Sequence, residues 1–152
     1  MLLVSACLAG INCRYSGNSC EDPVITDLVR QGRAIPACPE MLGGLGTPRP
    51  SCEIIHVPDK GRRVVSRDGR DFTAEFNRGA KRMLALAKAI DCQRAILKSR
   101  SPSCGFGLIH DGTFSGKLIS GNGLAAELLI NHGISVFTEN EFHQNEPQFE
   151  KK

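Results

Sequence analysis

The sequence predicts an α/β fold, a single-domain three-layer sandwich with a mainly parallel sheet and a small additional hairpin. Short apolar runs alternate along the chain with longer segments that carry apolar residues at helical spacing. Strands separated by helices pair in parallel and are covered by helices on both faces, an arrangement typical of Rossmann-like proteins. The chain has 152 residues, of which 41% are hydrophobic, enough for one domain with a buried core.

Each expected strand is a short run of apolar or β-branched residues bounded by polar, Gly or Pro residues. The run nearest the N-terminus, Leu2 to Ala6, is fully apolar apart from one serine and predicts a buried strand. A turn at Asp59-Lys60-Gly61 joins two neighbouring strands into the hairpin. The expected strands are residues 2–6, 34–37, 53–57, 63–66, 94–97 and 134–137.

Three helices are expected between these strands. The first begins at Asp22-Pro23, a capping residue followed by proline at the first helical position, and Gly32 ends it. The longest runs over 71–90, where Phe, Ala, Met and Ile recur on one face. The last runs over 122–132 and is closed by Gly133.

The remaining polar, Gly-rich and Pro-rich stretches predict loops, and the important ones follow strands. They cover residues 7–21, 38–52 and 99–107. In a parallel sheet, the loops after the carboxyl ends of the strands meet at one edge and form the binding crevice. We therefore expect side chains from these three loops to lie close together.

Seven cysteines stand out in the composition, and three of them directly follow expected strands: Cys7, Cys38 and Cys104. The start of the chain lacks the charged region of a signal peptide, so the thiols are expected to be reduced. Reduced cysteines serve as buried apolar residues, metal ligands or catalytic groups. The three thiols could converge at the edge of the sheet.

Soft thiolate ligands suit zinc or iron–sulfur clusters. The chain has no Cys-x-x-Cys pair of the kind common in structural zinc sites. A 4Fe-4S cluster held by only three cysteines would keep one open iron. Spacing alone leaves other assignments open: Cys13 or Cys52 could replace a ligand or add a fourth one.

Three readings that need no iron–sulfur cluster also remain open at this point. The strand-end cysteines could be ordinary core residues. Cys7, Cys13, Cys38 and Cys104 could hold structural zinc in a non-catalytic or regulatory module. A single reactive thiol could serve a metal-free redox or thiol-transfer enzyme.

The three loops carry recognisable motifs. They are Ser-Ala-Cys-Leu-Ala-Gly with Cys-Arg-Tyr-Ser-Gly at 5–17, Cys-Pro-Glu-Met-Leu-Gly-Gly-Leu-Gly-Thr-Pro-Arg-Pro at 38–50, and Leu-Lys-Ser-Arg-Ser-Pro-Ser-Cys-Gly at 97–105. Asp-Gly-Thr-Phe at 111–114 and His-Gly-Ile at 132–134 add to them. Together they resemble the thiouracil desulfidase (TudS) family over nearly the whole chain. Ser16 departs from the aspartate that members often carry.

The resemblance implies an enzyme with a 4Fe-4S cluster on three cysteine ligands and one open iron. It implies removal of sulfur from 4-thiouracil or 4-thiouridine monophosphate without net redox change, giving the uracil product and hydrogen sulfide. Carried over by motif, the ligands are Cys7, Cys38 and Cys104.

The resemblance also implies catalytic roles for Glu40 and Ser101. Glu40 resembles the family's acid/base carboxylate, and Ser101 resembles its active-site serine, with Ser103 as a rival for the same role. Without the motif, Glu40 reads as a solvated or capping glutamate and Ser101 as part of a Ser-Pro turn.

Substrate binding is expected from residues beside these cysteines. Arg14 and Arg49 could pair with an anion, and Tyr15 could stack on a pyrimidine. Gly43 and Gly44 could let backbone N–H groups approach the substrate or cluster. Arg49 could instead form an ion pair with a nearby glutamate, Glu40 or Glu53.

The bulk composition limits the partners. A net charge of +3, one Tyr and no Trp do not favour a stable nucleic-acid partner, and no apolar run has the length of a membrane span. We expect a cytoplasmic monomer or homodimer that acts on a small thiolated uracil compound. The expected domain covers 1–146, with a flexible tail at 147–152.

Overall fold

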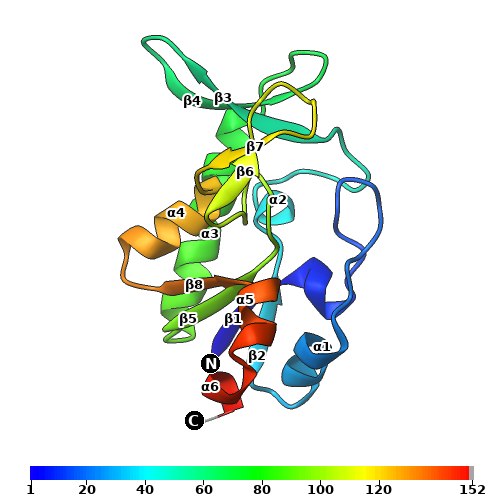
Figure 1. Cartoon of the computed structure of the whole chain (residues 1–152), viewed down its shortest axis with the longest axis vertical. Helices are drawn as coiled ribbons and strands as arrows, with labels where there is room; N and C mark the ends of the chain where they lie inside the picture. Colours follow the sequence, from blue (N-terminus) through cyan, green and yellow to red (C-terminus); the bar gives the residue numbers. More distant parts are fainter. Residues whose placement is uncertain (151–152) are drawn as a thin grey trace.

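The computed structural model describes residues 1–150, and its centre is a four-stranded parallel sheet (Figure 1). The strands are β1 (Leu2–Ser5), β2 (Ala34–Ala37), β5 (Arg94–Leu97) and β8 (Ser135–Thr138), in the order β2-β1-β5-β8. Every neighbouring pair is parallel. The predicted α/β class and parallel sheet are therefore confirmed.

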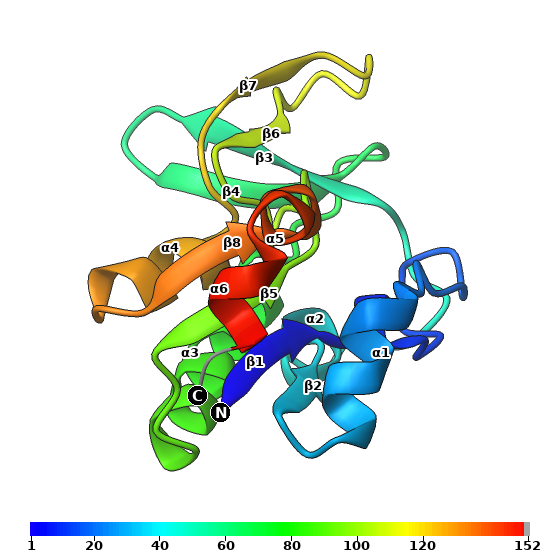
Figure 2. The same ribbon diagram turned by 60° about the horizontal axis from the view of Figure 1, so that its bottom comes forward.

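Helices cover both faces of this sheet because alternate strand residues point in opposite directions. Leu3, Ala95 and Leu97 share one core with α3 (Thr73–Ala89) and α4 (Leu124–Asn131). Val4 and Ile96 share the opposite core with α1 (Pro23–Arg30) and the C-terminal helices α5 (Glu139–Gln144) and α6 (Glu146–Glu150). Figure 2 shows the two groups on opposite sides of the strands, as the three-layer prediction requires.

Two antiparallel hairpins lie together beyond the carboxyl ends of the parallel strands, at the top of Figure 1. The expected one consists of β3 (Cys52–Val57) and β4 (Gly61–Ser66). The other, β6 (Leu108–His110) with β7 (Leu118–Ser120), was not predicted. Its strands have three residues each, too few for a period-two pattern to emerge, and Leu108 and Ile119 are half exposed.

Two single helical turns occupy positions where the sequence predicted only loop. They are η1, a 3-10 turn over Ala6–Ala9, and α2 (Pro39–Leu42). Four residues are too few to show helical periodicity. Each turn directly follows a strand of the sheet, so it fixes the direction in which the chain leaves that strand.

In the C-terminal segment, α6 extends to Glu150, the last described residue. Phe149 of α6 is 3% exposed and packs edge-to-face against Phe137 and Phe142. Residues 151 and 152 of the expected tail lie outside the described residues. No helix within residues 1–150 is long and apolar enough to cross a bilayer.

Close backbone contact between α2 and α3 depends on two glycines. A Cβ on Gly43 would lie 2.1 Å from the carbonyl oxygen of Glu75, and one on Gly79 would lie 1.9 Å from that of Pro39. Arg78 also donates to the carbonyl of Gly43 at 2.8 Å. The turn that follows β2 is therefore held directly on the longest helix.

Candidate active site

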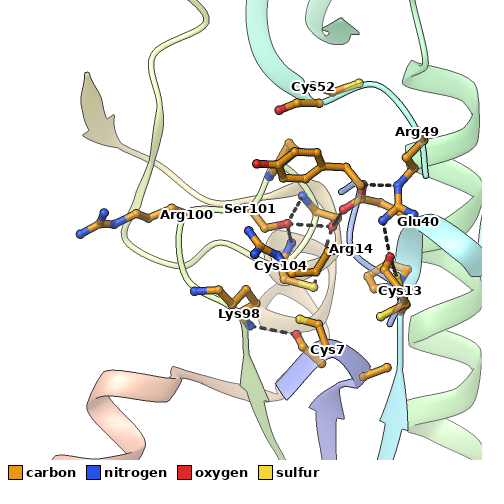
Figure 3. A pocket seen from close by; sticks show the side chains of 18 of the residues that line it. Cys7, Cys13, Arg14, Glu40, Arg49, Cys52, Lys98, Arg100, Ser101 and Cys104 are labelled. Carbon is orange, nitrogen blue, oxygen red and sulfur yellow. Dashed lines mark hydrogen bonds and ion pairs between the residues drawn. The ribbon is translucent and has the colours of Figure 1, made fainter. Parts of the chain in front are cut away.

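The loops after β1, β2 and β5 surround a cavity of about 320 Å³ at the carboxyl edge of the sheet. Its size is within the range of small-molecule sites. The predicted ligands Cys7, Cys38 and Cys104 all line it, together with Cys13 and Cys52. Figure 3 shows Cys7, Cys13 and Cys104 on one side of this pocket and Cys52 on the other. The predicted meeting of three distant loops therefore occurs.

Local structure explains how two of these thiols are presented. Cys38 is the N-cap residue of α2, with extended backbone angles and Pro39 at the first helical position. Cys104 follows a tight turn whose carbonyls, from Pro102 and Ser103, accept the first N–H groups of α4 at 2.9 Å. A Cβ on Gly123 would collide with Ser103 at 2.5 Å, so glycine is required for this close contact.

Cys13, whose role as a ligand the sequence left open, lies among the cavity thiols. It is 2% exposed and contacts both Cys7 and Cys38. The contact with Cys38 lowers the pKa of Cys13, but the contact with Cys7 and burial outweigh it and raise the pKa to about 11. Its carbonyl accepts a hydrogen bond from Arg49 at 2.7 Å, which fixes the loop.

Burial and neighbouring groups raise the pKa of two of the expected metal ligands, Cys38 and Cys104. The contact with Cys13, followed by burial, raises the pKa of Cys38 far above its ordinary value. Burial raises the pKa of Cys104 to about 12, against a smaller opposing effect from the hydroxyl of Ser5. Metal binding here must therefore release protons.

The chemistry of the donor set fits an iron–sulfur cluster. Within residues 1–150, no three His, Cys, Asp or Glu side chains are arranged to hold one metal ion. A 4Fe-4S cluster takes each thiolate on a different iron, so its ligands surround a cavity instead of converging on one point. Cys7, Cys38 and Cys104, all soft donors from separate loops around one cavity, meet this requirement.

Glu40 enters the cavity from the first turn of α2 and forms a buried ion pair with Arg49. The Arg49 Nε donates to Glu40 Oε1 at 3.0 Å, and the two side chains are only 6% and 15% exposed. The same guanidinium donates to the carbonyl of Gly46 and to Thr47 Oγ1. Arg49 is thus fully engaged by protein groups, as the alternative of an ion pair with Glu40 predicted.

A chain of hydrogen bonds joins the other oxygen of Glu40 to both candidate serines. Ser103 Oγ donates to Glu40 Oε2 at 2.8 Å, and the hydroxyls of Ser101 and Ser103 are 3.0 Å apart. Ser101 Oγ already accepts the backbone N–H groups of Ser103 and Cys104. Its proton is therefore directed toward Ser103, and the chain runs from Ser101 through Ser103 to Glu40 (Figure 3).

The other expected substrate contacts fall into two groups. Arg14 and Tyr15 line the cavity, with the guanidinium 5.4 Å from the ring centroid, and Arg14 has no carboxylate partner among the described residues. Gly43 and Gly44 are not among the lining residues, because that loop packs against α3.

Three features of the site were missed by sequence reasoning. The Ser5 hydroxyl accepts the N–H of Lys98 at 2.9 Å beside Cys104. Lys98 Nζ forms an ion pair with Glu139 at 2.7 Å, so the ammonium charge of Lys98 is compensated within the protein. His110, to which the sequence assigned no role, lines the cavity. Ser5 and Lys98 lie within the motifs at 5–17 and 97–105, but their spacing alone indicated no role in the site.

Comparison with known proteins identifies the family of this chain. The model of the 2-thiouracil desulfurase family matches residues 2–141. The protein YbbK of Bacillus subtilis (strain 168) is 46% identical over 148 residues, covering 94% of this chain and 98% of YbbK. The solved structure of the 4Fe-4S-dependent thiouracil desulfidase TudS has a TM-score of 0.87 and 41% identity, covering 98% of this chain and 97% of that chain.

The fold and the thiol-lined cavity therefore define a class of small α/β proteins with a cysteine-rich site at the sheet edge. Within that class, the chain belongs to the 2-thiouracil desulfurase family.

Proposed function

We propose that this protein is a 4Fe-4S-dependent, non-redox desulfidase that converts 4-thiouracil or 4-thiouridine monophosphate to the uracil product and hydrogen sulfide. The convergence of Cys7, Cys38 and Cys104 from three loops, beside a Glu–Ser–Ser chain, is the observation that carries the proposal. The likeness to the 4Fe-4S-dependent thiouracil desulfidase TudS supports the same cofactor.

Cys7, Cys38 and Cys104 would be the ligands. When bound, a cluster with three cysteine ligands supplies an open iron that can polarise the thiocarbonyl sulfur of the substrate. Thiols that must stay reduced support a cytoplasmic location. Cys13 and Cys52 would remain free thiols in the wall of the cavity.

Glu40 would act as the general base. Its carboxylate takes a proton from the water that attacks the ring carbon bearing sulfur. Arg49 and Ser103 each hold one of its oxygens, so the carboxylate enters the reaction in a fixed orientation. The C–S bond then breaks as the new carbonyl forms.

The hydrogen-bonded hydroxyls of Ser101 and Ser103 would transfer protons during this hydrolysis. One water adds its oxygen to the ring, and its two hydrogens leave with sulfur as hydrogen sulfide, so no electrons are gained or lost. Ser103 can return the proton held by Glu40, and Ser101 extends the path toward the cavity. Arg14 and Tyr15 are the proposed contacts for the substrate's anionic group and ring.

Anaerobic purification tests the proposal. Iron and acid-labile sulfide should be present in equal amounts, and sulfide should be released from 4-thiouracil as its absorbance is lost. Cys7→Ser, Cys38→Ser and Cys104→Ser should each abolish cluster binding, whereas Cys20→Ser, outside the cavity lining, should retain it. Stoichiometric zinc without iron would contradict the proposal and favour the metal-binding module.

A substrate comparison tests the position of the sulfur. The proposal expects faster turnover of 4-thiouracil and 4-thiouridine monophosphate than of 2-thiouracil. Preference for 2-thiouracil would leave the desulfidase reaction intact but overturn the choice of substrate.

The oligomeric state is a separate question. Gel filtration of the protein with its cluster bound tests the expected monomer or homodimer.

A further inference from the structure

His110, at the end of β6, forms part of the wall of the active-site cavity. Its backbone pairs with Leu118 of β7, which fixes the residue in the upper hairpin. The ring also lines a neighbouring groove and a small pocket behind the cavity. His110 of β6 and Cys52 of β3 are therefore the residues that the two hairpins contribute to the cavity wall.

Neither ring nitrogen of His110 has a hydrogen-bond partner among residues 1–150. Nδ1 is buried and unpartnered, one of only two such side-chain atoms in this part of the chain. Two other histidines contrast with it: His132 bonds the carbonyl of Leu128, and His143 bonds Asp22 and Glu146. A polar ring left unpaired in the wall of a substrate cavity is typical of a ligand contact.

The environment favours one tautomer. A buried N–H without a partner is rarer and more costly than a buried acceptor without one. The proton of a neutral His110 is therefore best placed on Nε2, which leaves Nδ1 as the buried acceptor. Nε2 is then the ring nitrogen that can act as a donor to a molecule in the cavity.

His110 lies at the end of the cavity remote from the thiol group. It shares the small pocket with Cys52, Arg100 and Pro102. Figure 3 places Cys52 on the other side of the drawn pocket from Cys7. A pyrimidine whose C4 sulfur points to Cys7, Cys38 and Cys104 directs N1, the ring atom opposite C4, away from them, and the C2 carbonyl beside N1 can then reach the wall that carries His110.

We propose that His110 is a substrate-binding residue whose Nε2–H donates a hydrogen bond to the C2 carbonyl oxygen of the thiolated pyrimidine. The inference rests on the desulfidase function proposed above and adds the recognition of the ring edge remote from sulfur. The C2 oxygen is common to the base and the nucleotide, so the contact serves both.

Substrate analogues test the contact. His110→Phe keeps an aromatic ring without the donor, and should raise KM for 4-thiouracil about tenfold with little change in kcat. Pyrimidine-4-thione lacks the C2 oxygen, so His110→Phe should leave its KM unchanged. His110→Gln, whose amide can donate from a similar position, should restore most of the affinity for 4-thiouracil. His132→Phe, on an exposed helix end, is the matched control.

A binding measurement separates this inference from the function. Titration of the wild-type protein with uracil, followed by NMR of the imidazole Hε1 resonances, should shift the His110 signal, which is identified by its loss in His110→Phe. An unchanged KM for 4-thiouracil in His110→Phe, or equal KM changes for both thiones, would overturn the inference. Absence of sulfide release by loaded wild-type protein would instead overturn the function, and the uracil titration would still report on the contact.

Discussion

Arg49 and Glu40 form an ion pair at 3.0 Å that is almost closed to solvent, and the arginine also holds the carbonyl of Cys13. One guanidinium therefore joins the loop after β1 to the loop after β2. Arg49 therefore holds the carboxylate of Glu40 and the backbone of Cys13 in fixed positions in the cavity wall. Arg49 is thus a positioning residue, and the expectation that it binds substrate directly gains no support from its contacts.

Substitution of Arg49 should lower kcat more than it changes KM. Arg49→Lys keeps the charge but cannot reproduce the four-way contact, so kcat should fall about tenfold or more while iron content stays near wild type. Arg14→Gln, at a cavity guanidinium that has no carboxylate partner within residues 1–150, should instead raise KM. Arg30→Lys, in an exposed ion pair, is the control. A rise in KM alone for Arg49→Lys would restore the substrate-binding role.

Ser101 and Ser103 should behave as one unit. Ser103→Ala removes the link to Glu40 and should lower kcat by about 10²-fold. Ser101→Ala should act similarly, and the double variant should be little worse than either single one, because both interrupt the same chain. Ser51→Ala, which alters the same cavity outside the chain, should have little effect. Additive losses measured in steady-state kinetics would exclude a shared proton path.

Gly79 should not tolerate a side chain although it lies within a helix. Gly79→Ala would ordinarily stabilise a helix by about 1 kcal/mol. Here its Cβ would meet the carbonyl of Pro39 at 1.9 Å, so we expect the free energy of unfolding to fall by about 1–3 kcal/mol. Because α2 carries Glu40, kcat should fall as well. Gly46→Ala, whose Cβ would enter open space, should change neither the urea midpoint nor kcat.

The contact between α5 and the start of α1 should depend on pH. Hydrogen bonds to Asp22 and then to Glu146 raise the pKa of His143 above its ordinary 6.5. A raised pKa in the folded state gives stability that is complete below about pH 6.5 and is lost as pH rises through the higher folded-state value. Urea unfolding at about pH 5.5 and about pH 8.5 should show this loss in wild type and a smaller one in His143→Gln.

His132→Gln is the control for the pH experiment, because His132 bonds only a carbonyl of its own helix. Its urea midpoints should follow those of wild type at both pH values. Equal pH dependence in wild type and His143→Gln would assign the effect to other groups.

The layers of the fold could be predicted because each strand of the sheet is an apolar run and each long helix has a clear apolar face. β6, β7 and α2 could not, since three or four residues carry no periodic pattern and their positions depend on contacts with α3 and the β3–β4 hairpin. The exact boundaries also moved by one or two residues, as at β8, which starts at Ser135.

The site was predictable to the extent that it depends on topology. Parallel strands place Cys7, Cys38 and Cys104 at one edge, so their convergence followed from the strand assignment. The partner of Arg49 stayed open because it depends on how the 38–52 loop folds onto α3. His110 could not be found from spacing, since the hairpin that carries it was not predicted.

The turn before Cys104 has a consequence for how the site is made. Its carbonyls hold the first N–H groups of α4, a helix that lies further along the chain. That turn therefore reaches its final shape only after the polypeptide beyond it has been synthesised and packed. An inorganic cofactor that uses Cys104 as a ligand therefore finds that ligand in its final position only after α4 has formed and packed.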